Sequence, residues 1–457
     1  MRFIDREPEL EELGRIRSLS ERKLFAIAVY GIRRVGKTRL ALEFLKDGGT
    51  YLFVNRNKRS SDLLKEFEGV LRSGGLLGEL ERLDSWERFV DVIIARSQGP
   101  VVIDEFQNFH HVEPSLFGTL QQALDTHEDT PGCIVLLGSV MGLVRRTFED
   151  SREPLYGRVK RAIRLRPLSL AATLEAGHEL GLSREDAVKC ACIFGGYPKY
   201  YVTIEDFALQ GRTAEEIIDA LVLSGNAPLE DEVNMVLSQE FGRRGGRYYS
   251  VLEAIANGST TLSSIAAYMR VPPTSITRHL KELRDYFELI GHELPFEGKR
   301  GIYLISHPLL RFWFANVHKD LTRYVARDPS FIEGIRRGLP AYLGRAFEPI
   351  AREFVVGKLG LTEARGQWGR VPGAPKGENT YEIDLIGRSG TGTCAFEFKW
   401  QSLDVRDCHT ILAGLERKTS LVRTLTPDTR LGIVARRIRG KRTLREEGAL
   451  VYDIDDF

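Results

Sequence analysis

Four ionisable side chains alternate along two expected strands near the C-terminus. In the stretch ENTYEIDLIGRSGTGTCAFEFKW (residues 378–400), Glu382 and Asp384 lie on the first strand, and Glu397 and Lys399 lie on the second. Residues i and i+2 of a strand share a face, so Glu397 and Lys399 point the same way and strand pairing can bring Asp384 beside them. The apolar residues around these charges favour a partly buried site. A solvated ladder of ion pairs is the alternative.

A bound metal ion would explain why carboxylates are clustered at this position. Two carboxylates within a few ångström of each other repel unless a cation lies between them, and oxygen ligands of this kind suit Mg²⁺ or Mn²⁺. Glu348 stands among the apolar positions of an expected amphipathic helix upstream, and it could add a ligand to Asp384 and Glu397. Lys399 would align and activate water while the metal stabilises charge on a scissile phosphate.

A second set of chemistry-bearing residues lies in the first third of the chain. LFAIAVYGIRRVGKTRLALEFL reads as an apolar strand, a loop and a helix, and the loop has the spacing Gly31, four residues, Gly36, Lys37, Thr38. Glycines let backbone N–H groups curl around a β-phosphate, a lysine neutralises β/γ charge, and a threonine hydroxyl ligates Mg²⁺ at a helix N-terminus. The loop therefore predicts ATP and Mg²⁺ as cofactors. The expected nucleotide-binding set also includes the neighbouring Arg34 and Arg39.

The strands that follow supply the residues expected to hydrolyse the nucleotide. GPVVIDEFQNF ends a buried strand in Asp104, which would hold Mg²⁺ through water, and Glu105, which would polarise the attacking water as a general base. Ser139, at the end of CIVLLGSV, could sense the γ-phosphate. Arg158 is a candidate arginine finger, and a solvated surface arginine is the alternative.

These motifs carry a family resemblance. FIDREPELEEL, GIRRVGKTRL, VVIDEFQNF, LLGSVM and PLYGR resemble the archaeal-type ATPases of the AAA-like signal-transduction (STAND) group over roughly the first half of the chain. The resemblance implies a three-layer α/β core with strand order 51432, followed by a helical subdomain. It also implies that Gly196 and Pro198, in FGGYPKYY, contact the nucleotide from a helical lid, and that Arg6 flanks the base.

The middle of the chain resembles a winged helix. Residues 248–314 show three helical periods, a proline-bounded turn and a strand–turn–strand ending. Such a domain could read DNA, or it could pack against the ATPase and relay its nucleotide state, and both readings stay open. As a DNA reader it would contact phosphates through Arg278, Lys281, Lys299 and Arg300.

The acidic cluster resembles a nuclease motif. Glu348, Asp384 and Glu397-Phe398-Lys399 resemble the PD-(D/E)xK nuclease superfamily, and the joint arrangement resembles the C-terminal domain, of the DUF234 type, that is often fused to this ATPase class. One departure is that Asp384 follows Glu-Ile, without the usual preceding proline.

The expected fold is therefore a multidomain α/β chain. We expect a P-loop ATPase core at 1–168, a helical lid at 169–243, a winged helix at 244–317, a linker at 318–340 and a restriction-endonuclease-like α/β domain at 341–457.

Composition agrees with several soluble domains. The length of 457 residues favours about three domains, and 42% hydrophobic with 28% charged residues is typical of globular protein. A net charge of +2 neither requires nor excludes nucleic acid. Five irregularly spaced cysteines and the lack of a stretch of ~20 apolar residues predict a cytoplasmic protein without a membrane span.

Two functions of different class follow. The first is an ATP-dependent DNA-processing protein with a metal-dependent nuclease site. The second is a nucleotide-gated regulator that binds DNA or a partner without cutting it. A helicase-like motor is a third reading, although no second motor core is visible in the sequence. If Arg158 acted on a neighbouring subunit, the ATPase domain would form a homo-oligomer.

Overall fold

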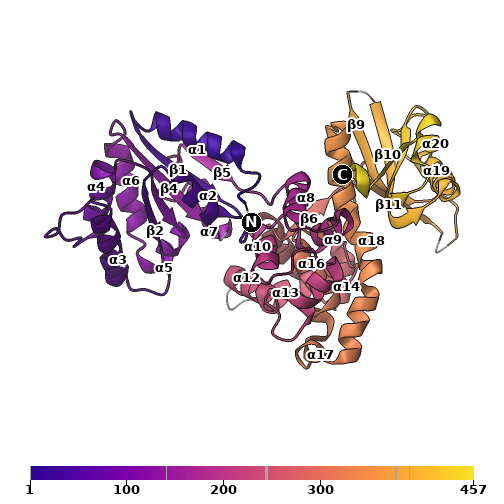
Figure 1. Cartoon of the computed structure of the whole chain (residues 1–457), viewed down its shortest axis with the longest axis horizontal. Coiled ribbons are helices and arrows are strands. Elements are labelled where there is room, and N and C mark those ends of the chain that lie inside the picture. Colours follow the sequence, from indigo (N-terminus) through magenta and orange to yellow (C-terminus); the bar gives the residue numbers. More distant parts are fainter. Residues whose placement is uncertain (1, 140, 242–244, 376–377, 391) are drawn as a thin grey trace. The chain divides into compact units, whose positions relative to one another are not determined.

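The computed structural model describes residues 2–139, 141–241, 245–375, 378–390 and 392–457. The chain divides into two compact units (Figure 1). The N-terminal unit comprises Arg2–Pro167 together with Tyr197–Lys199, and the C-terminal unit comprises Leu168–Gly196 and Tyr200–Phe457.

A five-stranded parallel sheet forms the centre of the N-terminal unit. Its strands are β1 (Leu24–Tyr30), β2 (Thr50–Phe53), β3 (Val101–Asp104), β4 (Gly132–Gly138) and β5 (Arg161–Arg164). They lie in the order β2-β3-β4-β1-β5, which confirms the expected order 51432. All four pairings are parallel. Helices cover the sheet, so the strands read as continuous apolar runs, and every residue of β3 is buried.

The helices of this unit alternate with the strands. They are α1 (Glu7–Leu19), α2 (Lys37–Phe44), α3 (Ser60–Ser73), α4 (Trp86–Arg96), α5 (Phe109–Val112), α6 (Leu116–Thr126) and α7 (Met141–Glu149), with the short η1 (Phe106–Asn108). Side chains from α3, α4 and α6 form one hydrophobic core with β2, β3 and β4. Trp86 belongs to this core, with its ring 5.2 Å from that of Phe109.

The C-terminal unit begins with helices. They are α8 (Leu170–Glu179), α9 (Arg184–Phe194), α10 (Pro198–Asp206, whose first two residues belong to the N-terminal unit), α11 (Ala214–Ile218), η2 (Asp219–Leu223) and α12 (Glu232–Phe241). Serine hydroxyls cap α8 and α9, because Ser169 and Ser183 accept hydrogen bonds from backbone N–H groups of the first turns.

Helices and a small hairpin occupy residues 246–316. The helices are α13 (Gly246–Ala256), α14 (Leu262–Tyr268), η4 (Pro273–Ser275), α15 (Thr277–Lys281), η5 (Glu282–Tyr286) and α16 (Pro308–Asn316). The hairpin strands β6 (Ile290–Glu293) and β7 (Ile302–Ile305) are antiparallel. Their order along the chain is the one that a winged helix would have.

One long helix crosses the boundary that the sequence suggested at residue 340. After η6 (His318–Asp320) and α17 (Leu321–Val325), α18 runs from Pro329 to Leu359. Asp328 caps it by accepting from the backbone N–H groups of Ser330 and Phe331. Residues 318–340, expected as a linker, therefore include a packed part of this helix, with Phe331, Ile332, Ile335 and Leu339 buried. Intervening charged residues and Pro340 obscured this buried stripe in the sequence.

A mixed sheet follows α18. Its strands are β8 (Glu363–Arg370), β9 (Thr380–Ser389), β10 (Gly392–Leu403), β11 (Arg430–Ile438) and β12 (Leu450–Asp453), in the order β12-β11-β10-β9-β8. β8, β9 and β10 pair antiparallel, whereas β10, β11 and β12 pair parallel. The α/β fold class expected from the sequence is thus confirmed for this part of the chain.

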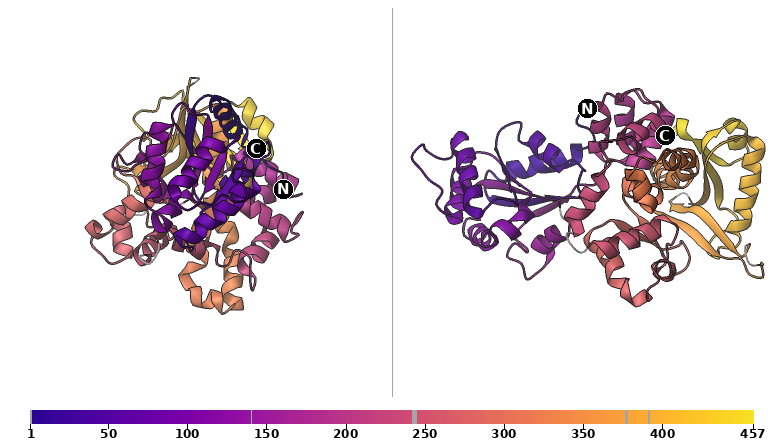
Figure 2. Two further views of the ribbon diagram at one scale, coloured as in Figure 1. Left: turned by 90° about the vertical axis from the view of Figure 1, so that its left-hand side faces the viewer. Right: turned by 90° about the horizontal axis from the view of Figure 1, so that it is seen from below.

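Helices cover both faces of this sheet. α18, in orange and nearly end-on in the right view of Figure 2, packs on β10 from one side. The helix α19 (Val405–Thr419) packs on the other side, where Leu415 meets Ile383 and Ala395. The short α20 (Lys441–Glu446) precedes β12. β10 is therefore central, and charged side chains on it are largely removed from water.

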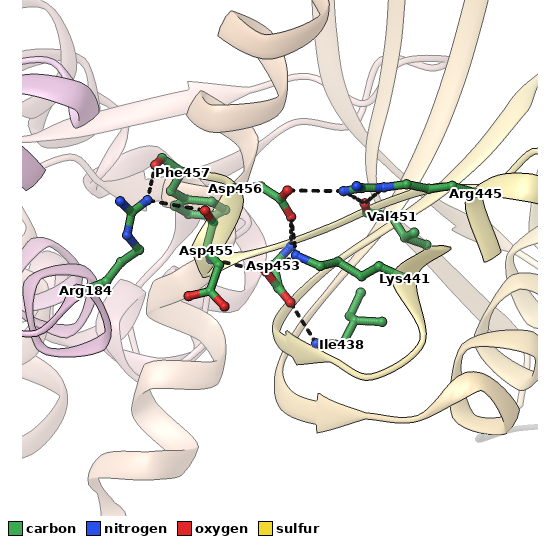
Figure 3. A network of polar contacts seen from close by, with 9 residues as sticks. All are labelled: Arg184, Ile438, Lys441, Arg445, Val451, Asp453, Asp455, Asp456 and Phe457. Carbon is green, nitrogen blue, oxygen red and sulfur yellow. Dashed lines mark hydrogen bonds and ion pairs between the residues drawn. The ribbon is translucent and has the colours of Figure 1, made fainter. Parts of the chain in front are cut away.

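A polar network fixes the last strand to the helices of the same unit (Figure 3). Lys441 donates to Asp453 at 2.6 Å and to Asp456 at 2.9 Å. Arg184, at the start of α9, donates to the backbone oxygen of Phe457. The ring of Phe457 stacks on that of Phe354 of α18 at 4.2 Å. These contacts join the sheet to α9 and α18.

Candidate functional site

The loop between β1 and α2 has the wrapped conformation that its glycines allow. A side chain at Gly31 would lie 2.3 Å from the carbonyl oxygen of Leu165, and Gly36 has φ +96°. Lys37 folds back over the loop and donates to the carbonyls of Gly31 at 2.7 Å and Ile32 at 3.1 Å. The structure therefore builds the phosphate loop where the sequence predicted it.

Asp104 meets this loop from the end of β3. Its Oδ2 accepts from the Thr38 hydroxyl at 2.7 Å and from the Tyr51 hydroxyl at 2.7 Å. β2 and β3 are neighbours in the sheet, with Tyr51 opposite Val102 and Phe53 opposite Asp104, so the long side chain of Tyr51 reaches Asp104 from two residues before the end of β2. Burial and then the hydrogen bond to Asp104 raise the pKa of Tyr51, so its hydroxyl stays a donor. The sequence reading missed Tyr51, since no local pattern marks it.

Glu105 adopts an uncommon backbone conformation next to Asp104. Its φ is +55°, in the left-handed region that disfavours residues with a side chain. Its carboxylate accepts from the Ser139 hydroxyl at 2.7 and 2.8 Å and from the Gln107 amide. Two residues predicted separately, Glu105 and Ser139, are thus in direct contact, and Gln107 joins them without having been predicted.

Arg6 donates hydrogen bonds to the backbone of the phosphate loop and of a neighbouring segment. It is 5% exposed and donates to the backbone oxygens of Val35 at 3.1 Å and Arg166 at 2.8 Å. Burial lowers the pKa of Arg6 from its ordinary value, while nearby carboxylates including Glu9 oppose the shift. The contact with Val35 fixes the loop backbone directly before Gly36.

The other predicted nucleotide residues take varied positions. Pro198 lies beside the loop, with its Cγ 3.8 Å from where a side chain on Gly36 would begin. Arg34 has φ +72° in the loop, and Arg39 is exposed on the first turn of α2. A side chain at Gly196, in the C-terminal unit, would lie 2.2 Å from the carbonyl oxygen of Leu168, so tight packing explains this glycine.

Arg158 is held by a carboxylate of its own unit. It donates to both oxygens of Asp125 at 2.9 Å and to the carbonyl of Pro154 at 3.1 Å. Its role as an arginine finger stays a prediction, and that role would require it to leave Asp125.

In the C-terminal unit, three of the predicted residues converge where β9 and β10 diverge. The two strands pair only as far as Leu385 and Phe396, so the residues beyond them are not hydrogen-bonded across the ladder. Lys399 donates to Glu397 at 2.7 Å and lies 3.9 Å from Asp384. Asp384 accepts from the backbone N–H of Phe398 at 2.6 Å.

A second lysine completes the cluster. Lys418, near the end of α19, donates to the other oxygen of Glu397 at 2.6 Å. The sequence reading missed it, although Lys418 follows the buried Leu415 by three residues and so shares its helix face. Glu397, only 4% exposed, is neutralised on both oxygens by ammonium groups.

Glu348 and Asp384 are buried close to other negatively charged carboxylates. Burial, and then the charges of Asp384 and Glu382, raise the pKa of Glu348 to about 7. Burial and the charge of Glu397 raise the pKa of Asp384 to about 6. For Lys399, burial opposes protonation, but neighbouring carboxylates led by Glu397 outweigh it and raise its pKa. The free energy of ionising these acids is therefore high.

The donor set fits a hard cation in chemistry, although it is not assembled as a complete metal site. Within the described ranges, no group of three or more His, Cys, Asp or Glu side chains could hold a metal ion. Glu348, Asp384 and Glu397 offer only oxygen atoms, which Mg²⁺ and Mn²⁺ prefer. A cation at Glu397 would have to displace Lys399 or Lys418.

The predicted nucleic-acid contacts are exposed side chains of the C-terminal unit. Arg278, on α15, pairs with Glu282 at 2.8 Å, and Lys281 lies one residue before Glu282. Lys299 and Arg300 lie on the turn between β6 and β7. Among the described helices, none is long and apolar enough to cross a membrane.

Known proteins match both ends of the chain. Residues 3–204 match a family described as an ATPase domain predominantly from Archaea. Residues 313–411 match a family described as Archaea bacterial proteins of unknown function. An uncharacterized protein of Methanocaldococcus jannaschii, MJECL04, is 28% identical over 471 residues, and the match covers 100% of both chains.

Two solved structures match this chain over most of their own length. The Walker-type ATPase paby2304 of Pyrococcus abyssi is 21% identical, with a TM-score of 0.53 over 68% of this chain and 96% of that chain. The ORC2 protein of Aeropyrum pernix, in ADPNP-ADP complexes, is 14% identical, with a TM-score of 0.47 over 72% of this chain and 94% of that chain.

Three features of the N-terminal unit are typical of one kind of nucleotide-binding protein. The phosphate loop, the contact between Thr38 and Asp104, and the strand order are those of a P-loop ATPase. The match of residues 3–204 to an ATPase domain supports nucleotide hydrolysis. The structure of a Walker-type ATPase shares the fold.

Proposed function

We propose that this chain is an ATP-hydrolysing DNA-processing protein whose P-loop ATPase controls a metal-dependent nuclease-like site in the C-terminal unit. The observation that carries the proposal is the convergence of Asp384, Glu397 and Lys399 at the point where two buried strands diverge. Burial, and then the charge of Asp384, raise the pKa of Glu348, and the charge of Glu348 is the least of the carboxylate charges that raise the pKa of Lys399.

In the nucleotide site, each residue has a role that its contacts suggest. Lys37 would turn from the loop carbonyls to the β- and γ-phosphates, and Thr38 with Asp104 would hold Mg²⁺, which neutralises phosphate charge when bound. Glu105 would take the proton of the attacking water, and Ser139 would orient its carboxylate. Arg6 would keep the loop in its wrapped form.

In the C-terminal site, the carboxylates and Lys399 would have different roles. Oxygens of Asp384, Glu397 and Glu348 would hold Mg²⁺ or Mn²⁺, which stabilises charge on a scissile phosphate when bound. Lys399 has a raised pKa and is therefore an ammonium at neutral pH. It would donate hydrogen bonds to the attacking water and the phosphate, so another group must accept the proton.

DNA would approach through the region of α13–α16 and its hairpin, which we assign as a winged helix. Arg278 and Lys281 on α15, with Lys299 and Arg300 on the β6–β7 turn, would contact backbone phosphates. If Arg158 acts in trans, the N-terminal units would assemble around shared nucleotides, which sedimentation with and without ATP would reveal.

A cleavage assay tests the proposal. Full-length protein is incubated with labelled single-stranded, duplex and branched DNA in Mg²⁺ or Mn²⁺. We expect cleavage that falls at least about 100-fold in Glu397→Gln and Lys399→Met. Glu446→Gln, an exposed residue of α20, is the matched control. No cleavage of any substrate, or full cleavage by both variants, would contradict the nuclease assignment.

One observation favours a second function. Because Lys399 and Lys418 already neutralise both oxygens of Glu397, the cluster is also consistent with a structural ion-pair site in a nucleotide-gated DNA-binding regulator. In that case Arg278→Ala and Lys281→Ala would abolish DNA binding, and no variant of Glu397 would change the response to DNA.

A further inference from the structure

A cavity lies within the C-terminal unit, between the β6–β7 turn and strands β8 and β9. Its volume is about 630 Å³, inside the range of ligand pockets. The lining residues that matter are Lys299 and Arg300 of the turn, Trp368 and Arg370 of β8, and Tyr381 and Glu382 of β9. Neither the ATPase chemistry nor the carboxylate cluster uses this space.

Hydrogen bonds fix the walls of the cavity. The turn docks on the edge strand β8, where the backbone N–H of Phe296 donates to the carbonyl of Gly366 at 2.8 Å. The indole N–H of Trp368 donates to the carbonyl of Arg300 at 3.0 Å. The hydroxyl of Tyr381 accepts from the Gln367 amide at 3.1 Å. Both aromatic rings are thus held in place before any ligand arrives.

The cations of the cavity are available for a ligand. In the described part of the chain, the Lys299, Arg300 and Arg370 side chains make no hydrogen bond or ion pair. The carboxylate of Glu297 is already used, because it accepts from the backbone N–H of Arg423 at 2.9 Å. Glu382 is the remaining acid, two residues before Asp384 on β9. The cavity lining therefore carries more positive than negative charge, and it also contains two aromatic rings.

We propose that this cavity binds an unpaired nucleotide of single-stranded nucleic acid. Its base stacks on Trp368 or Tyr381, and the flanking phosphates contact Lys299, Arg300 and Arg370. A base within a duplex is covered by its neighbours and cannot lie on a ring, so the cavity selects unpaired strands.

The location of the cavity links it to the proposed function. Because Glu382 lines the cavity and Asp384 follows on the same strand, a nucleic-acid strand anchored here has its backbone close to the carboxylate cluster. The inference that this strand is a nuclease substrate rests on the proposed function, whereas binding in the cavity does not.

Binding is measured without metal ions, on the full-length protein, by fluorescence anisotropy of a labelled oligothymidylate of twenty nucleotides. We expect Trp368→Ala and Arg370→Ala each to weaken binding about tenfold, and Trp368→Phe to retain most of it. Arg370→Ala also lowers the salt slope by about 0.7, the value for one lost phosphate contact. Arg442→Ala, whose side chain is 93% exposed on α20, stays within about twofold of the wild type.

Three results would overturn the cavity assignment. One is unchanged affinity in Trp368→Ala and Arg370→Ala. Another is a loss of affinity for duplex DNA, in these two variants, as large as the loss for the oligothymidylate. That result would indicate an electrostatic surface, which does not distinguish unpaired from paired bases. The third is displacement of the oligonucleotide by polyglutamate at equal charge concentration, which would indicate an acidic polypeptide as the ligand. The Trp368→Phe variant separates loss of stacking from misfolding.

Failure of this inference is distinguishable from failure of the nuclease assignment. Oligothymidylate binding that survives in a protein without cleavage activity would retain the cavity and reject the nuclease. If the protein cleaves DNA but Trp368→Ala and Arg370→Ala bind the oligothymidylate as well as the wild type does, the nuclease assignment stands and the cavity assignment is wrong.

Discussion

At the scale of single residues, two carboxylates of the nucleotide site depend on hydroxyl groups that lie far away in the sequence. Tyr51 donates to Asp104, and Ser139 donates to Glu105. Residues that orient a metal-binding carboxylate tune the affinity for the metal even though they do not touch it. We therefore propose that Tyr51 positions the carboxylate of Asp104.

Removal of the Tyr51 hydroxyl tests this role. We expect Tyr51→Phe to raise the Mg²⁺ concentration for half-maximal ATP hydrolysis about tenfold, because Asp104 loses a hydrogen bond that fixes its carboxylate. The measurement is ATP turnover in a Mg²⁺ titration. Tyr156→Phe, an exposed residue of the same unit, serves as the control. An unchanged Mg²⁺ requirement in Tyr51→Phe would contradict the role.

Glu348 should make the C-terminal unit less stable at alkaline pH. Its pKa is raised from 4.5 to about 7, so its contribution to stability is complete below pH 4.5 and is lost as the pH rises through 7. We expect Glu348→Gln to be more stable than the wild type by roughly 3 kcal/mol at pH 8, and the difference to vanish near pH 4.5. Thermal unfolding across this range measures it. Glu333→Gln, exposed on the same helix, should show no such trend.

At the scale of elements, helix ends and strand ends place the chemistry. α18 begins at the Asp328 cap and carries Glu348 to the sheet, and β9 and β10 separate beyond Leu385 so that Asp384 and Glu397 have room. His307 caps α16 in the same way, because its Nδ1 accepts from the backbone N–H of Leu310 at 3.4 Å.

The His307 cap predicts a loss of stability in acid. Burial lowers the pKa of His307 from 6.5 to about 3, so its neutral form stabilises the fold above pH 6.5 and that stability is lost as the pH falls toward 3. We expect His307→Asn, which keeps a capping group, to lose less stability than the wild type between pH 6.5 and 4. Thermal unfolding at each pH measures the slope. If the stability of His307→Asn changed with pH as steeply as that of the wild type, His307 would not be the source of the acid sensitivity. The control is His409→Asn, at an exposed position.

At the scale of the whole molecule, the two candidate sites belong to different compact units. The phosphate loop, Asp104 and Glu105 lie in the N-terminal unit, and the carboxylate cluster lies in the C-terminal unit with the β6–β7 hairpin. The segment Tyr197–Lys199 is counted with the N-terminal unit although the chain on both sides belongs to the other. Pro198, which lies beside Gly36, is also the first residue of α10.

Control of one site by the other predicts different behaviour in two ATPase variants. Glu105→Gln should bind ATP but hydrolyse it at least about 100-fold more slowly, because the general base is lost, whereas Lys37→Ala should bind ATP poorly. Cleavage of DNA in the presence of ATP should then differ between the two variants. The exposed Glu128→Gln is the control. Identical cleavage by both variants, with and without ATP, would show that the sites act independently.

Features that depend only on neighbouring residues could be predicted from the sequence. The glycine spacing predicted the phosphate loop, and the i, i+2 spacing of Glu397 and Lys399 predicted their shared face, because loop wrapping and strand pleat are local properties. The strand order followed from the resemblance that these motifs carry, and the sheet confirms it.

Contacts between groups that are distant in the sequence could not be predicted in this way. Tyr51 reaches Asp104 across 53 residues, and Lys418 reaches Glu397 across 21. The β6–β7 turn meets β8 across more than 60 residues, as in the contact of Arg300 with Trp368. Each contact depends on the order of strands in a sheet and on the face where a helix packs. Those are set by burial of the whole apolar surface, and no short window of sequence contains that information.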